Sequence, residues 1–162
     1  MNAKTFSMLA AAALLAGCVS YGGASLRPGA STEAEVRSVM GEPGLVIPES
    51  DGSKRLVYPR GPLGTQTFMV DVGRDGVLKA VQPVLNDGVF NAIRPGWTRD
   101  QILHAIGPPG DTMHFARSDT TAWDYKYRDT WGYTAIFSVP FDRDGIVVSK
   151  LSTRIERDDG RN

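Results

Sequence analysis

The chain has 162 residues, of which 41% are hydrophobic, and its formal net charge at pH 7 is +0. That length and composition allow one domain of ordinary size, or two small ones, with a buried core. A general nucleic-acid binder normally carries an excess of basic residues, so the balanced charge argues against nucleic acid as a partner.

Residues 1–17 have the pattern of a lipoprotein signal peptide. Lys4 supplies a positive charge before the apolar stretch 8–17, which is too short to span a bilayer as a helix. The stretch ends in Leu15-Ala16-Gly17-Cys18, which resembles the bacterial lipobox. The resemblance implies cleavage before Cys18, a diacylglyceryl group on its thiol, and fatty acylation of the new amine, for example with palmitate.

The lipid predicted on Cys18 sets the expected location of the protein. Several acyl chains anchor a protein firmly, whereas a single chain is a marginal anchor. The next residue is Val19 rather than Asp. By resemblance to enterobacterial sorting, this implies the outer membrane, with the chain facing the periplasm. Residues 18–25 are expected to form a flexible tether. Cys18 is the only cysteine, so no disulfide is expected.

A short helix with both ends marked is predicted before Gly107. Thr98 can cap its first turn, and Gln101, three residues on, can complete a capping box. Trp97 and Ile102 have the spacing of a hydrophobic staple, in which the residue before the cap packs on the first buried turn. Gly107 then ends the helix.

The same helix signal occurs 66 residues earlier. Thr32 and Gly41 precede Thr98 and Gly107 at that spacing, and Glu35 again completes a capping box. A signal that recurs at a fixed spacing indicates an internal repeat.

Two Arg-Asp-Gly tripeptides, at 74–76 and 143–145, repeat in the same way and have the composition of tight hairpin turns. The globular part is therefore interpreted as two copies of one unit. The first repeat covers 26–85, the second covers 86–156, and a charged tail follows over 157–162.

Each copy is predicted to contain three strands after its helix. The expected strands are 56–58, 67–72 and 77–81 in the first repeat, and 122–128, 133–141 and 146–151 in the second. Segments 44–54 and 111–120 are expected to be loops, and a further short helix is expected after Asn86. The predicted fold class is α+β. Each repeat is a short helix or helix pair followed by a three-stranded antiparallel β-meander, and the helices cover its apolar face.

The second repeat carries a family resemblance. Its motifs are Arg94-Pro95-Gly96-Trp97-Thr98, Ile106-Gly107-Pro108-Pro109, Trp123-Asp124-Tyr125 and Phe141-Asp142-Arg143-Asp144-Gly145. With the lipobox, they resemble the SmpA/OmlA (BamE-like) family of outer-membrane lipoproteins, although Trp97 stands where that family usually has Met. The resemblance implies a small αβ domain that assists the BAM complex, the machine that assembles β-barrel proteins in the outer membrane. The tandem arrangement also resembles the β-lactamase inhibitor protein fold.

No motif indicates a catalytic residue, a cofactor or a small-molecule substrate. No serine sits in a Gly-x-Ser-x-Gly elbow. His104 and His114 lack the Cys or second nearby His that would complete a metal set, so surface or structural roles are expected. Asp142 and Asp144 could suggest a Ca²⁺ loop, but the remaining ligands are absent and a hairpin turn explains them. The protein is therefore expected not to be an enzyme.

Aromatic side chains are the remaining candidates. Trp123, Tyr125 and Tyr127 alternate with charged residues on one strand and are expected to be buried under the helices. Trp97 is explained by the staple, with protein binding as the alternative. Trp131 lies at a hairpin tip, where no core contact is evident. Because an exposed Trp is a typical anchor at interfaces, Trp131 and Trp97 are the candidate protein-binding residues.

Two functional hypotheses follow. The first is a non-enzymatic outer-membrane lipoprotein that binds envelope proteins, with BAM complex subunits as candidate partners, and that contributes to β-barrel assembly or envelope integrity. The alternative is an inhibitor-like module whose duplicated unit docks on an envelope enzyme. A hydrolase has no motif in its favour.

Overall fold

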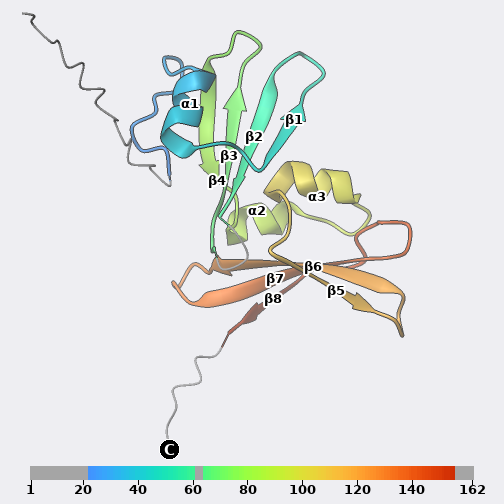
Figure 1. Ribbon diagram of the computed structural model, residues 1–162. Coiled ribbons are helices and arrows are strands. Elements are labelled where there is room, and N and C mark those ends of the chain that lie inside the picture. Colours follow the sequence, from blue (N-terminus) through green and yellow to red (C-terminus); the bar gives the residue numbers. More distant parts are fainter. Residues whose placement is uncertain (1–21, 61–63, 156–162) are drawn as a thin grey trace, which may run out of the picture.

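The computed structural model describes residues 22–60 and 64–155. Its fold is α+β, with two four-stranded antiparallel sheets and three short helices in the described ranges (Figure 1). The predicted signal peptide, Cys18 and the tail over 157–162 lie outside the described residues.

The first unit consists of one helix and the first sheet. Its elements are α1 (Glu33–Met40), β1 (Leu45–Pro48), β2 (Lys54–Pro59), β3 (Thr67–Val72) and β4 (Leu78–Pro83). The four strands pair with one another in chain order, so β1 and β4 are the edges of this sheet.

The second unit consists of two helices and the second sheet. Its elements are α2 (Asp87–Ala92), α3 (Arg99–Ile106), β5 (Asp111–Phe115), β6 (Thr120–Arg128), β7 (Thr134–Phe141) and β8 (Leu151–Arg154). These strands also pair in chain order, with β5 and β8 at the edges.

The prediction of three strands in each unit is wrong, because each sheet has four. The additional strands, β1 and β5, lie within 44–54 and 111–120, which the sequence predicts to be loops. β1 has only four residues and β5 is exposed along its whole length, so neither gives a long run of alternating buried and exposed positions.

The last strand also begins later than predicted. Ile146 and Val147 form isolated bridges with Thr98 and Phe141, and the regular strand β8 starts at Leu151. The reason is that the backbone of Val147 exchanges hydrogen bonds with the segment just before α3, which takes this stretch away from regular pairing with β7.

Both predicted capping boxes are present. The hydroxyl of Thr32 accepts a hydrogen bond from the Glu35 amide, and the Glu35 carboxylate accepts one from the Thr32 amide. Thr98 and Gln101 make the same exchange at the start of α3. These contacts satisfy amides that have no partner inside the helix, which is why the helices begin at these residues.

The internal repeat is visible in the backbone contacts. The amide of the first helical residue donates to the carbonyl of the glycine in the Arg-Asp-Gly turn, from Glu33 to Gly76 and from Arg99 to Gly145. In each unit, therefore, the start of the capped helix is fixed to the turn that follows the third strand.

A tyrosine fixes the other end of each capped helix. The hydroxyl of Tyr58 donates to the carbonyl of Gly41 at 3.1 Å, and the hydroxyl of Tyr125 donates to the carbonyl of Gly107 at 3.0 Å. Both glycines have φ near +80°, at 82° and 81° respectively. These equivalent contacts make Tyr58 and Tyr125 corresponding residues of the two units.

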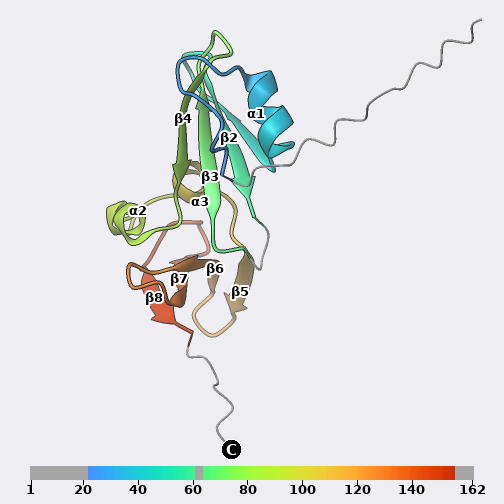
Figure 2. The same ribbon diagram turned by 90° about the vertical axis from the view of Figure 1, so that its left-hand side faces the viewer.

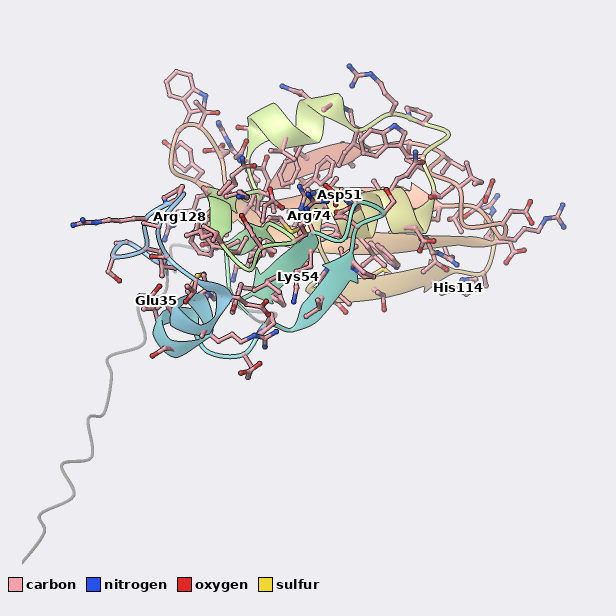
Figure 3. All side chains as sticks on the ribbon, turned by 90° about the horizontal axis from the view of Figure 1, so that it is seen from above. Glu35, Asp51, Lys54, Arg74, His114 and Arg128 are labelled. Carbon is pink, nitrogen blue, oxygen red and sulfur yellow. The ribbon has the colours of Figure 1, made fainter. Side chains whose placement is uncertain are left out.

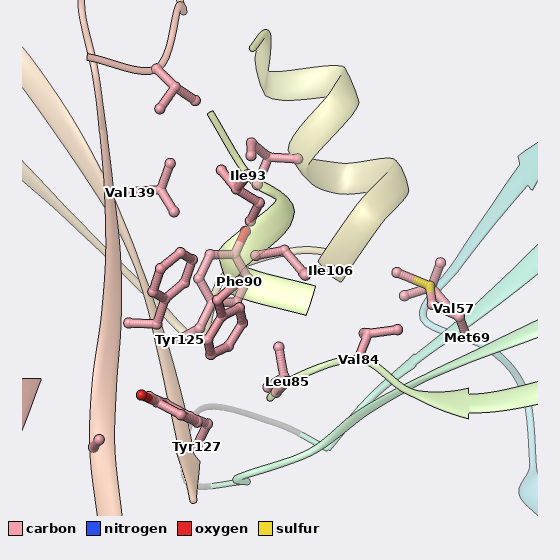
Figure 4. Close-up of a cluster of buried hydrophobic side chains, with 14 of the residues drawn as sticks. Val57, Met69, Val84, Leu85, Phe90, Ile93, Ile106, Tyr125, Tyr127 and Val139 are labelled. Carbon is pink, nitrogen blue, oxygen red and sulfur yellow. The ribbon is translucent and has the colours of Figure 1, made fainter. Parts of the chain in front are cut away.

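The first sheet is buried on both faces. One face packs on α1, in a cluster formed by Val36, Met40, Leu56, Tyr58, Val70, Val72 and Leu78. The opposite face turns Val57 and Met69 toward the helices of the second unit (Figures 2 and 4). The layers are therefore α1, the first sheet, the α2 and α3 layer, and the second sheet.

One core joins the two units. Figure 4 shows Phe90 of α2 and Ile106 of α3 between Val57 of the first sheet and Tyr125 of the second. Phe90 stacks on Phe137 of β7 with ring centroids 3.9 Å apart. The helices of the second unit thus cover both sheets, and not only their own.

A polar bridge runs beside this core. Arg55 of β2 forms a two-pronged ion pair with Asp71 of β3, with N–O distances of 2.7 and 3.2 Å. The same guanidinium donates to the carbonyl of His104 at 3.0 Å, and the Nε2 atom of His104 lies 2.7 Å from the Glu49 carboxylate. His104 therefore has a structural role, because it links α3 to the first unit.

Candidate protein-binding surface

Trp131 lies at the tip of the β6–β7 hairpin with 79% of its surface exposed. Within this tip, Gly132 has φ of 82° and its amide donates to the Asp129 carbonyl, which closes a tight turn. The chain therefore holds a large apolar side chain in solvent, an arrangement that the hydrophobic effect disfavours unless the side chain has a partner.

Asp129 organises the hairpin tip from within. Its Oδ1 atom accepts the amides of Trp131 and Tyr133, both at 2.9 Å, and its Oδ2 atom accepts Arg154 Nε at 2.6 Å. An aspartate that accepts amides two and four residues further on fixes the turn conformation. The backbone that carries Trp131 is therefore already ordered.

Asp87 fixes the same tip from the second unit's first helix. Its carboxylate accepts the Thr130 amide at 3.0 Å, the Thr130 hydroxyl at 2.6 Å and the Tyr127 hydroxyl at 2.9 Å. The hydrogen bond from the Thr130 hydroxyl is the main reason that the pKa of Asp87 is lowered, and burial only partly opposes it. The negative charge of Asp87 thus stabilises the tip against α2.

Two further side chains complete the surface around Trp131. Tyr133 is 60% exposed, and the guanidinium of Arg154 lies over its ring at 4.8 Å from the centroid. A hollow of about 250 Å³ lies beside the tip, lined by residues that include Asp87, Trp131 and Arg154. Trp, Tyr and Arg are the residue types most enriched among the energetic centres of interfaces, and here Trp131 and Tyr133 of the hairpin lie beside Arg154 of β8.

The other predicted aromatic residues lie in or against the core. Tyr125 and Tyr127 are buried as expected, and Trp123 packs against the shared core while partly exposed. Trp97 is also half-buried against the core cluster that contains Ile102, which fits its predicted role as a staple. Of the two candidate binding residues, Trp131 is thus the exposed one.

The polar candidates have structural contacts. The Oδ1 atom of Asp142 accepts the amides of Asp144 and Ile146 at 3.0 and 2.9 Å, which is the expected hairpin turn. His114 lies on β5 and contacts the Thr121 hydroxyl at 3.3 Å. Within the described ranges, no group of three or more His, Cys, Asp or Glu side chains is placed to hold a metal ion. In the same residues, no helix has the length and apolar character to cross a membrane.

Sequence reasoning did not identify the residues that order the Trp131 tip. Asp87 is 43 residues away from Thr130, and its local sequence does not predict the contact. Arg154 is the last residue of β8, and it lies beyond the strand that the sequence predicts at 146–151. The only local signal for the hairpin tip is its turn composition, Asp129-Thr130-Trp131-Gly132.

Comparison with known proteins gives structural resemblances only. No family model matches the chain, and no curated protein matches it. One similar solved structure is a DUF4309 family protein (YjgB) from Bacillus subtilis, with 14% identity, coverage of 81% of this chain and 82% of that chain, and a TM-score of 0.31. A second is a candidate β-lactamase inhibitor protein from Streptococcus mutans, with 11% identity, coverage of 78% and 84%, and a TM-score of 0.34.

A third is an extracellular protein with an SCP domain from Bacillus anthracis, with 12% identity and a TM-score of 0.31. The match covers 95% of this chain and 49% of that protein. Scores this low establish neither a family nor a function, and the SmpA/OmlA resemblance remains a prediction from the motifs.

Proposed function

We propose that this protein is a lipid-anchored, non-enzymatic protein-binding module of the bacterial envelope, and that Trp131 is its principal anchor. The observation that carries the proposal is the ordered, exposed Trp131 tip. Asp87 and Asp129 already fix the turn. The hairpin of this chain would therefore lose little conformational entropy when a partner buries Trp131.

The partner class follows from the predicted location. With a lipid on Cys18, the chain faces the periplasm, and its leading candidate partners are subunits of the outer-membrane β-barrel assembly machinery. The alternative partner is a single envelope enzyme, which the module would dock on in the manner of an inhibitor. The packing of the two units is compatible with either partner, because it holds Trp131 on a rigid body.

The experiment is a pull-down from gently solubilised outer membranes, performed with the tagged, lipidated chain and read by mass spectrometry. Stoichiometric recovery of β-barrel assembly subunits supports the accessory role, and recovery of one envelope enzyme supports the inhibitor-like role. Trp131→Ala should lose the partner in either case. Val46→Ala, which removes an exposed apolar side chain from β1 of the first sheet, should retain it. Retention of the partner by the Trp131→Ala variant would exclude Trp131 as the anchor.

The anchor itself is tested by Cys18→Ser. This variant should fold normally, because Cys18 precedes the described fold, but it should leave the membrane fraction. If the Cys18→Ser protein still sediments with outer membranes after a salt wash, the lipid-anchor prediction is wrong.

A further inference from the structure

The described chain begins in contact with the first unit. Gly23 is buried, and its carbonyl accepts the amide of Leu26 at 2.9 Å. A Cβ on Gly22 would lie 3.8 Å from the ring of Phe68 of β3, so the backbone passes directly beside this ring. Leu26 packs on the cluster between α1 and the first sheet. The chain is therefore fixed to the fold from its first described residues.

Hydrogen bonds to β4 hold the segment that follows. The amide of Gly29 donates to the carbonyl of Leu78, and the amide of Leu78 donates to the carbonyl of Ser31, both at 2.8 Å. These bonds join the segment to the first sheet, so the position of Gly22 on the molecule is set by that sheet.

Only a short stretch of chain separates this fixed start from the predicted lipid. Cys18 precedes Gly22 by four residues. Four residues span at most about 14 Å even when fully extended. A compact body of this size has a radius of gyration of about 14 Å, so its full width is more than twice the reach of the tether. The anchored molecule therefore cannot turn its far side to the bilayer, because Gly22 would then lie beyond that reach.

The tether joins the molecule near the junction of the two units. Phe68, beside Gly22, pairs with Pro83, the last residue of β4, and the next two residues, Val84 and Leu85, belong to the shared core. Figures 1 and 2 show the blue start of the described chain about midway along the molecule. A body that is tethered at its middle lies along the bilayer with both units near it, whereas a body tethered at one end would stand upright.

The Trp131 tip lies on the tethered side. Figure 1 shows the start of the described chain and the tip of the β6–β7 hairpin at the left-hand side, and the β5–β6 turn at the right-hand side. A short series of contacts joins the first two: Phe68 pairs with Pro83, and Asp87, four residues later, accepts hydrogen bonds from Thr130. The side held toward the bilayer therefore carries Trp131, which is the most exposed large hydrophobic residue of the described chain.

We propose that the short tether holds the Trp131 tip beside the membrane surface, and that the partner of Trp131 is a protein embedded in that membrane. This inference rests on the lipid anchor and the Trp131 anchor of the proposed function, and it separates two classes of partner. An embedded protein presents its periplasmic rim at the level of the tip. A soluble enzyme would have to enter the narrow space between the molecule and the bilayer.

The tip does not have the chemistry for insertion into lipid. Four charged side chains make hydrogen bonds that hold it, namely Asp87, Asp129, Arg128 and Arg154. Entry into the acyl chains would remove water from all of these charges, at a large cost in free energy. Two acidic and two basic groups also cancel, so anionic headgroups gain no net attraction to the tip. A protein surface, which offers polar groups beside apolar ones, is the better match for Trp131.

The orientation is measured with one fluorophore on the lipidated chain, reconstituted in liposomes of phosphatidylcholine. Cys18 is the only cysteine, and the lipid occupies its thiol, so an introduced cysteine is the one free thiol. Arg128→Cys places the label next to the Trp131 tip. The matched control is Arg117→Cys, which replaces another exposed arginine, in the β5–β6 turn. Figure 3 shows Arg128 and His114, three residues before Arg117, at opposite ends of the molecule.

Phosphatidylcholine with a nitroxide on its headgroup should quench the label at 128 about twofold more strongly than the label at 117, because a tether of about 14 Å brings only one side to the headgroups. A twelve-residue Gly-Ser insertion between Tyr21 and Gly22 should remove this difference, since a tether of about 55 Å lets the molecule turn. Equal quenching at 128 and 117 without the insertion overturns the orientation alone. A lipidated chain that does not float with the liposomes overturns the lipid anchor as well.

Two further readouts identify what covers Trp131. Its fluorescence is obtained as the difference between the unmodified chain and Trp131→Phe, and phosphatidylcholine brominated on its acyl chains should leave it unquenched. Quenching would assign the tip to lipid and overturn the inference. In the pull-down from outer membranes, the protein that Trp131→Ala loses should be an embedded membrane protein. If it is a soluble enzyme, Trp131 remains the anchor, but the embedded partner is excluded.

Discussion

In each unit, the hydroxyl group of one tyrosine links the C-terminal end of the capped helix to the sheet of that unit. Burial raises the pKa of Tyr125 and of Tyr58, because the ionised phenolate would be poorly solvated at either position. Each hydroxyl is therefore a neutral donor, and it satisfies a carbonyl at the end of its helix.

The two tyrosines are predicted to differ in their contribution to stability. Tyr125→Phe leaves the carbonyl of a buried glycine without its partner and should lower the free energy of unfolding by about 1–2 kcal/mol. Tyr58→Phe should cost less, about 0.5–1 kcal/mol, since Gly41 is partly exposed and water can replace the donor. Urea unfolding measures both, and Tyr133→Phe, at an exposed position, is the control. A larger loss for Tyr58→Phe than for Tyr125→Phe would contradict this ranking.

Asp87 makes the second unit sensitive to acid. Because its pKa is lowered in the folded state, its charge contributes stability that is present above the unfolded pKa, about 4, and is lost as the pH falls through the folded value. The difference in melting temperature between the unmodified chain and Asp87→Asn should therefore be full at neutral pH and shrink below about pH 4. Melting curves at a series of pH values test this, and a difference that grows in acid would be inconsistent with it.

At the scale of elements, the sequence predicts those whose ends are chemically marked. Thr32 and Thr98, each followed three residues later by Glu35 or Gln101, predict the starts of α1 and α3, and glycines predict their ends. The long strands β6 and β7 follow from alternation that one buried face imposes. Marked ends and one-sided burial are local properties, so they can be read from the sequence.

The edge strands could not be predicted in this way. All residues of β5 are exposed, so no burial pattern marks it, and β1 contains four residues and ends in Pro48. What defines both strands is the backbone of a neighbour. The Trp131 tip was found because its turn composition is local, whereas its stabilisation by Asp87 and Arg154 comes from residues remote in sequence.

Gly107 ends α3, and two separate properties of the site require glycine there: the backbone conformation and the close approach of the first sheet. Gly41 and Gly107 both combine a φ near +80° with ψ near −170°, a region open essentially only to glycine. A Cβ on Gly41 would meet nothing within 4 Å, whereas one on Gly107 would lie 2.9 Å from Val57 and 3.2 Å from Thr67 of the first sheet.

The two Gly→Ala variants therefore separate conformation from packing between units. Gly41→Ala should cost about 1–3 kcal/mol through backbone strain alone. Gly107→Ala should cost about 1–3 kcal/mol more, because it also forces the two units apart. Equal losses in urea unfolding would show that the end of α3 is not packed against the first sheet in solution.

At the scale of the whole molecule, the shared core predicts that the two units unfold together. All three tryptophans belong to the second unit, so tryptophan fluorescence reports on that unit alone. Leu56→Ala removes a fully buried side chain between α1 and the first sheet and should cost about 2–5 kcal/mol. Its fluorescence-detected urea midpoint should fall accordingly. An unchanged midpoint, with a separate transition by circular dichroism, would mean that the units unfold independently.

The double coverage of the first sheet has a consequence for biosynthesis. An exported chain that emerges from its N-terminus completes this sheet at Pro83, but the helix that covers the sheet's second face ends only at Ile106. Until then, the nascent first unit presents Val57 and Met69 to solvent as an unfinished surface. A chain that pauses or is cleaved in this interval would be prone to aggregate or to be held by a chaperone, so uninterrupted export through α3 protects the first unit.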